Sequence, residues 1–232
     1  MRKDLIFFAA FVGFVAVLAV VCRTAVRTST NLTADTRHTV VIDAGHGGED
    51  GGAVGISGIL EKEINLGVSQ KLESLLMFCG VNTSMTRRED ISLNSDTSSP
   101  IRKRKASDIK ERVKTVVNTP NAVLISVHQN SFPQDNCKGA QVFFSGNNAE
   151  SKVLAELVQN YLKDGIDDGN HRVEKRADDS IFILKNVNCP AILVECGFVT
   201  NSRESALLMT EEYRLKLAVC ITGAYLKYTD EC

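Results

Sequence analysis

Four side chains suited to metal chemistry stand at or near the ends of apolar runs in this sequence. His46 follows VVIDAG, His128 ends VLISVH, and Glu195 lies within AILVECGF. Glu61 opens the stretch EKEINL, where the first long helical pattern begins. Because ligands collect outside the carboxyl ends of parallel strands, we expect these side chains to converge. Two histidines and one carboxylate form a typical catalytic zinc set, which leaves one coordination place for water.

A second glutamate beside such a set serves as a general base. Water bound to zinc has a pKa near neutrality, and a neighbouring carboxylate removes its proton as it attacks a carbonyl. Each residue alone also has a structural explanation. A histidine at a strand end is commonly hydrogen-bonded, Glu61 suits the positive N-terminal end of a helix dipole, and Glu195 can pair with an arginine. The four residues together are more specific and predict a zinc-dependent hydrolase.

The loop around His46 contains five glycines between residues 45 and 52. Glycine loses the most backbone entropy on folding, so this composition indicates a backbone that must approach something closely. The loop lacks the GK[ST] ending of a phosphate-binding P-loop. We therefore expect a tight turn that presents His46 to a metal. Asp43 either orients a ligand histidine or forms a structural hydrogen bond within the loop, and both alternatives stay open.

Two further polar residues are candidates for substrate binding. Asn130 lies two residues after His128 and either binds substrate or braces its loop. Arg87 closes an apolar run in SMTRRED and either contacts substrate or anchors the loop that follows.

The segment IRKRKASDIKERVK, residues 101–114, carries seven basic residues. One interpretation is a solvated helix face with some pairing between glutamate and arginine. The other is a surface that attracts the carboxylates of a substrate or of an acidic partner.

Strand-like and helix-like patterns alternate along the chain. Apolar, β-branched runs occupy residues 39–43, 80–86, 122–128, 140–145 and 190–195. Apolar residues at helical spacing occur between them, at Ile64–Leu75, Ile109–Val116 and Val153–Leu162, and a final helix is predicted over 211–228. The pattern predicts an α/β layered domain, with a largely parallel, mixed central sheet flanked by helices and the zinc site at the strand carboxyl ends.

The N-terminal part of the chain is predicted to be a separate segment. Residues 5–22 carry no charge and follow Met1-Arg2-Lys3-Asp4, so residues 1–22 form a membrane anchor or a signal segment. The threonine-rich residues 23–37 are predicted to be a linker, and the catalytic domain covers 38–232. We expect an exported protein, either anchored in the membrane or secreted if the segment is cleaved.

Composition excludes some classes of protein. A net charge of −1 and a pI near 6.4 argue against a protein that binds nucleic acid. The seven cysteines include no CxxC pair, so neither a four-cysteine zinc site nor a disulfide framework is expected. Most of them are predicted to be free, largely buried thiols.

The motifs IDAGHGGEDGGAVG, GILEKEINL, SVHQN and VECGFVTN together resemble the zinc-dependent N-acetylmuramoyl-L-alanine amidases of bacteria, the amidase-3 type. The resemblance spans residues 38–228. It implies that His46, Glu61 and His128 hold one zinc ion per chain and that Glu195 is the catalytic glutamate. It also implies hydrolysis of the amide bond between N-acetylmuramic acid and L-alanine in peptidoglycan.

Within that family, the short chain with one N-terminal apolar segment is most similar to the germination-specific amidases of spore-forming bacteria. This similarity implies removal of stem peptides in spore cortex, for the formation of muramic-δ-lactam. The segment 91–100 is too short for a helical lid, so we expect external control, including an activating protein partner from the sporulating cell. The alternatives are a zinc carboxypeptidase acting on stem peptides and a non-catalytic wall-binding or regulatory protein.

Overall fold

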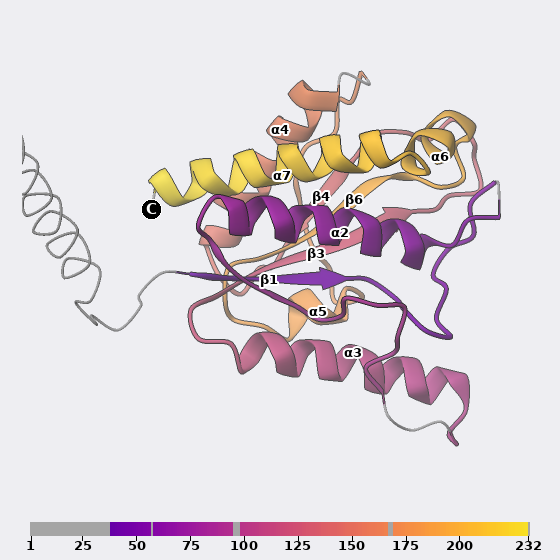
Figure 1. Ribbon diagram of the computed structural model, residues 1–232, viewed down its shortest axis with the longest axis horizontal. Coiled ribbons are helices and arrows are strands. Elements are labelled where there is room, and N and C mark those ends of the chain that lie inside the picture. Colours follow the sequence, from indigo (N-terminus) through magenta and orange to yellow (C-terminus); the bar gives the residue numbers. More distant parts are fainter. Residues whose placement is uncertain (1–37, 57, 95–97, 167–168, 232) are drawn as a thin grey trace, which may run out of the picture. The chain divides into compact units, whose positions relative to one another are not determined.

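The computed structural model describes residues 38–56, 58–94, 98–166 and 169–231 (Figure 1). Within these ranges the chain forms one six-stranded sheet with the order β2-β1-β3-β6-β4-β5. The strands are β1 (Thr39–Ala44), β2 (Asn82–Met85), β3 (Ala122–Asn130), β4 (Gln141–Phe144), β5 (Lys175–Arg176) and β6 (Ala191–Phe198). Strands β2, β1, β3 and β6 are parallel, whereas β4 pairs antiparallel to β6.

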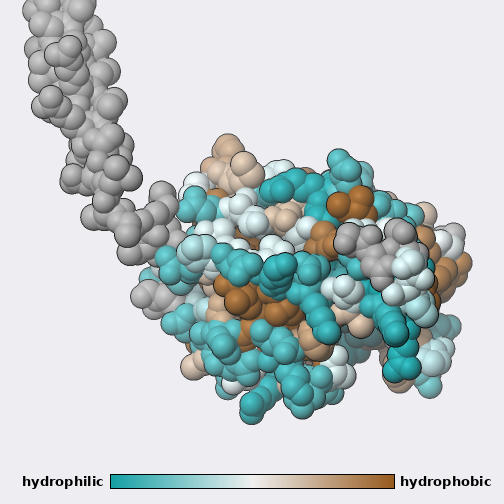
Figure 2. All heavy atoms as spheres, turned by 90° about the horizontal axis from the view of Figure 1, so that it is seen from below, coloured by the Kyte–Doolittle hydropathy of each residue, from teal (hydrophilic) through white to brown (hydrophobic). Residues whose placement is uncertain are grey.

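Helices cover both faces of this sheet (Figure 1). One face carries α2 (Glu61–Phe78), α4 (Glu150–Ile166) and α7 (Glu211–Glu231). The other carries α3 (Ile101–Val117) and the short α5 (Phe182–Lys185). Helix α6 (Ser202–Leu208) follows β6. Figure 2 views the α3 side, where hydrophilic side chains surround an area of hydrophobic ones.

The central strands are apolar at almost every position because both of their sides are buried. In β1, Val40 and Ile42 belong to the larger core cluster, beneath α2, α4 and α7. Val41, whose side chain points to the opposite face, packs with Val116 of α3 and Ile183 of α5. Alternation of side chains along a strand thus supplies two cores from one continuous apolar run.

The predicted fold class, a layered α/β domain with a largely parallel, mixed sheet, is confirmed. The five predicted strands and four predicted helices correspond to β1, β2, β3, β4, β6 and to α2, α3, α4, α7. Strand β5 and helices α5 and α6 were not predicted, because such short elements carry little periodicity. The expected anchor or signal segment and linker, residues 1–37, lie outside the described residues. Within the described ranges, no helix combines the length and the apolar character needed to cross a membrane.

The cysteine prediction holds only in part. The five described cysteines are all free, as expected. Cys196 and Cys220 are buried, whereas Cys79 is exposed and the other two, Cys137 and Cys189, are partly exposed.

The first prediction concerns the layer between the sheet and α7. Leu72 of α2 is fully buried, whereas Phe78 at the end of the same helix is 90% exposed. Leu72→Ala should lower the free energy of unfolding by about 2–5 kcal/mol, because it removes buried apolar area and leaves a cavity. Phe78→Ala should change it by no more than about 0.5 kcal/mol. Denaturant titration measures both values, and equal effects would contradict this assignment of the core.

Candidate functional site

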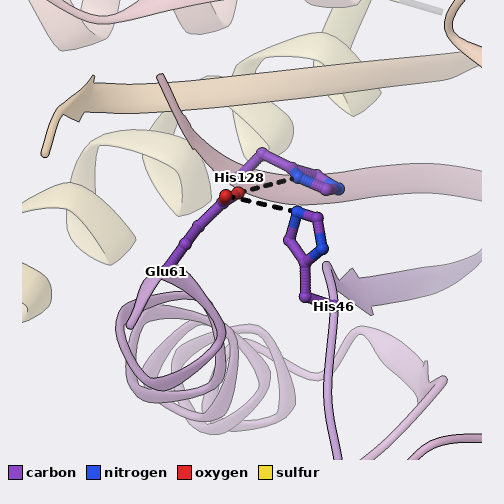
Figure 3. Close-up of side chains that lie close together, drawn as sticks. All are labelled: His46, Glu61 and His128. Atoms are coloured by element: carbon purple, nitrogen blue, oxygen red, sulfur yellow. Dashed lines mark hydrogen bonds and ion pairs between the residues drawn. The ribbon is translucent and has the colours of Figure 1, made fainter. Parts of the chain in front are cut away.

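Three metal-compatible side chains meet at the carboxyl edge of the sheet (Figure 3). His46 lies in the loop after β1, Glu61 is the first residue of α2, and His128 lies near the end of β3. One nitrogen from each histidine and one carboxylate oxygen lie within 4.8 Å of one another. Segments separated by up to 82 residues in sequence (46 to 128) are brought together here because β1 and β3 are adjacent and parallel.

Glu61 is the centre of this cluster. Its side chain is 5% exposed, and one carboxylate oxygen, Oε1, lies 3.0 Å from Nδ1 of His128 and accepts from the backbone N–H of Gln129. The other, Oε2, lies 3.2 Å from Nε2 of His46 and accepts from the N–H of Ala53. Burial by itself would raise the pKa of Glu61, but the two histidines hold it well below its usual range. Glu61 is therefore an ionised carboxylate that faces both imidazoles.

His128 is held by close packing against the glycine loop. A Cβ atom on Gly45 would lie 2.3 Å from the Cε1 and Nε2 atoms of the His128 ring. Only glycine at position 45 therefore leaves room for the ring. The glycines of this loop predicted that some group approaches its backbone closely. At Gly45 that group is the imidazole of His128.

His46 occupies a left-handed backbone conformation, with φ of 61°. Its Nδ1 atom lies 2.8 Å from Oδ2 of Asp50, so Nε2 is the atom that faces Glu61. Burial alone would lower the pKa of His46, but the hydrogen bonds to Asp50 and Glu61 raise it to about 9. Asp50 was not singled out from the sequence. Its position four residues after His46, in the same glycine-rich loop, was the available signal.

Among the described residues, Asp43 forms no hydrogen bond with a histidine. Its carboxylate accepts from Thr86, Ser126 and Arg112. Burial would raise the pKa of Asp43, but the charges of Arg112 and His128 and the hydrogen bonds from Ser126 and Arg112 lower it to about 2. None of these hydrogen-bond partners is a histidine or belongs to the glycine loop, so Asp43 instead joins β1 to β3, to α3 and to the residue after β2.

Arg87 lies beneath the loop rather than beside the cluster. It is 2% exposed and donates to the backbone carbonyls of Ala44, Gly45 and Lys62, and of Glu89. Burial and the nearby charge of Arg112 lower its pKa to about 10, so it stays charged at neutral pH. These are the contacts of a loop anchor, and a guanidinium buried in this way offers no surface to a substrate.

Glu195 stands beside His128 in the register of β6 against β3. Its Oε2 atom is shielded from solvent and has no hydrogen-bond partner among the described residues. Burial raises the pKa of Glu195 to about 7, and the negative charge of Glu61 contributes to this shift. A buried carboxylate oxygen without a partner is costly, and it is the type of group that acts as a proton acceptor near neutral pH.

Asn130 lies at the end of β3, where its backbone carbonyl accepts from the N–H of Val199. Its side chain is half-buried. A role for that side chain in substrate binding therefore stays a prediction.

The donor set fits zinc. Two imidazole nitrogens and an ionised carboxylate oxygen are the ligands that a catalytic zinc site uses, and Asp50 supplies the hydrogen bond that such histidines make through their other nitrogen. Glu195 adds a carboxylate that is free to accept a proton.

Comparisons with known proteins agree on one family. The family model of N-acetylmuramoyl-L-alanine amidases matches residues 40–226. A germination-specific N-acetylmuramoyl-L-alanine amidase of Bacillus subtilis is 33% identical over 192 residues, which cover 83% of this chain and 80% of the relative.

Two solved structures are similar as well. The CwlD amidase of Clostridioides difficile, solved in complex with the GerS lipoprotein, has a TM-score of 0.80 and 36% identity, covering 84% of this chain and 99% of that one. The catalytic domain of the amidase CwlV from Bacillus (Paenibacillus) polymyxa var. colistinus has a TM-score of 0.71 and 30% identity, covering 83% and 98%.

The second prediction tests the packing of His128 on the glycine loop. In Gly45→Ala the methyl group should push the imidazole away from Glu61, and zinc affinity should fall about tenfold or more. Gly51→Ala, in the same loop, is the matched control, because its Cβ would meet only the side chain of Leu60, at 3.4 Å. Competition with a chromophoric chelator measures both affinities. Equal zinc affinity in the two variants would show that the ring position does not matter for the metal.

Proposed function

This chain belongs to the N-acetylmuramoyl-L-alanine amidase family, and we propose that it is a zinc-dependent member that removes stem peptides from spore-cortex peptidoglycan. As an amidase it is a hydrolase of the peptidoglycan amide bond. The observation that carries the zinc proposal is the cluster of His46, Glu61 and His128 within 4.8 Å, all from different elements. The similarity to a germination-specific amidase of Bacillus subtilis supports the role in cortex.

We assign the three clustered side chains as zinc ligands and Glu195 as the catalytic glutamate. Zinc bound there would supply a water of nearly neutral pKa and an electrophile for the amide carbonyl. Glu195 accepts one proton from the water molecule. At the same time, the oxygen of that water forms a bond to the lactyl carbonyl carbon. Glu195 then gives a proton to the nitrogen of L-alanine as the carbon–nitrogen bond breaks. The products are a free lactyl carboxylate and a free amine on the stem peptide.

The loop and the helix carry out separate tasks in this mechanism. Glu61 is the negatively charged ligand. The backbone N–H groups of Ala53 and Gln129 hold its carboxylate in place. Asp50 accepts from Nδ1 of His46 and thereby leaves Nε2 available for the metal. The raised pKa of Glu195 matches it to proton transfer near neutral pH.

In spore cortex, muramic-δ-lactam forms when the free lactyl carboxylate is joined to the sugar amine that deacetylation exposes. We assign the chain to this step because one of its relatives is a germination-specific amidase. We also propose that it has a protein partner from the sporulating cell, since the CwlD neighbour was solved with a lipoprotein.

We further propose an exported enzyme with three parts. Residues 1–22 serve as an anchor or signal segment, residues 23–37 as a linker, and residues 38–232 as the catalytic domain. The charge-free run 5–22 and the wall as the site of the substrate support this arrangement.

The third prediction tests the reaction itself. Muropeptides digested with the purified full-length protein and zinc should show free lactyl carboxyl groups and intact stem peptides by mass spectrometry. Glu195→Gln keeps the shape of the side chain but cannot accept a proton, so the rate should fall by about a hundredfold or more. Zinc content of this variant, measured alongside, serves as the control for the metal site.

Two outcomes would contradict the proposal. Stem peptides shortened from their carboxyl end would identify a zinc carboxypeptidase instead. No hydrolysis of any peptidoglycan by a zinc-loaded protein would indicate a wall-binding or regulatory protein.

A further inference from the structure

The basic helix α3 does not serve only as a solvated surface. Three of its side chains contact the loop that carries His46: Arg104 pairs with Glu49, Lys105 pairs with Asp50, and Arg112 donates to the backbone carbonyl of His46. Lys105 and Arg112 are seven residues apart, which places them on the same face of the helix. On the remaining surface, Lys103 and Lys110 are exposed. The basic residues of α3 therefore fall into an outward-facing set and a set directed at the loop that carries His46.

The inward contact of α3 is made by Arg112, which is 2% exposed. Its guanidinium donates to the carbonyls of His46 at 2.6 Å and Ala44 at 2.7 Å. It is neutralised by Asp43 at 2.7 Å and Asp108 at 2.6 Å. A non-glycine residue with positive φ persists only where its surroundings hold it, and Arg112 holds the carbonyl of the residue that has this conformation.

The outer contact of α3 reaches the imidazole of His46 indirectly, through Asp50. Nζ of Lys105 lies 2.6 Å from Oδ1 of Asp50, and Oδ2 of the same carboxylate lies 2.8 Å from Nδ1 of His46. Arg104 pairs in parallel with Glu49 at 2.6 Å. With one oxygen held by Lys105, the carboxylate of Asp50 keeps the orientation in which its other oxygen meets the ring. That contact aims Nε2 of His46 at Glu61.

We propose that Lys105 is a positioning residue for the zinc ligand His46, acting through Asp50 on a loop whose backbone Arg112 holds. This inference rests on the proposed zinc site. Partners that orient a ligand histidine typically change metal affinity by about 10–100-fold. The Lys105–Asp50 pair is itself partly exposed, with Lys105 48% exposed, so it contributes little to the stability of the fold.

Whether zinc affinity rises or falls when Lys105 loses its charge distinguishes a positioning role from a purely electrostatic one. Removal of a positive charge near a zinc ion should strengthen zinc binding if Lys105 acts only through its charge. Loss of orientation should weaken it. Lys105→Met keeps the length of the side chain and removes the ammonium group, so it distinguishes the two effects.

The fourth prediction is that Lys105→Met lowers the zinc affinity of the full-length protein about tenfold, as measured by chelator competition. Lys105→Arg should keep the zinc affinity of the original protein, because a guanidinium can still donate to Asp50. Lys103→Met is the matched control, since it removes an exposed lysine of the same helix and should leave zinc affinity unchanged. The melting temperature of the metal-free protein should be the same in all of these variants.

A double-mutant cycle tests the path through Asp50. Asp50→Asn should also weaken zinc binding, and Lys105→Met should have no further effect in that background. Unchanged or tighter zinc binding in Lys105→Met overturns the inference, as does an equal additional loss in the Asp50→Asn background.

His46→Ala separates the failure of this inference from the failure of the zinc site. If His46→Ala loses zinc while Lys105→Met keeps it, only the positioning role is wrong. If His46→Ala binds zinc as tightly as the original protein, the proposed ligand set is wrong and the positioning role falls with it.

Discussion

The buried carboxylate of Glu61 is the interaction on which the candidate site depends. Burying an ionised carboxylate is costly unless it is hydrogen-bonded and paired. Here its two oxygens are met by the backbone of two segments, at Ala53 and Gln129, and by both histidines of the cluster. Asn65, fully buried one turn along α2, donates to the same carboxylate and to the carbonyl of Gly45. The first turn of α2, the glycine loop and the end of β3 are thus joined by one negative charge.

The same loop is also held through the backbone carbonyls at its start. Two buried arginines, Arg87 after β2 and Arg112 on α3, donate to the carbonyls of residues 44–46. Asp43 balances this positive charge within the core. Helices on both faces therefore contribute to the candidate site, with α2 supplying Glu61 and α3 holding the loop. This explains how His46 keeps a left-handed conformation that few non-glycine residues adopt.

The sequence alone was sufficient for the layers of the fold and for the convergence of the cluster. Continuous β-branched runs predict buried parallel strands, and parallel strands bring their carboxyl ends to one edge, which is where His46 and His128 meet. It was not sufficient for the role of α3. A run of lysine and arginine predicts a solvated face, and nothing local indicates that Arg112 pairs with Asp43, 69 residues earlier. Arg87 remained ambiguous for the same reason, since its partners are backbone carbonyls of a distant loop.

The central claim is that one zinc ion is held by two imidazoles and one carboxylate. X-ray absorption at the zinc edge of the zinc-loaded protein tests it most directly, because sulfur and light-atom ligands lie at different distances. We expect a first shell of nitrogen and oxygen alone at about 2.0–2.2 Å, with the outer scattering of two imidazole rings. A sulfur ligand at about 2.3 Å would contradict the account, because it would place the metal on a cysteine and away from His46, Glu61 and His128.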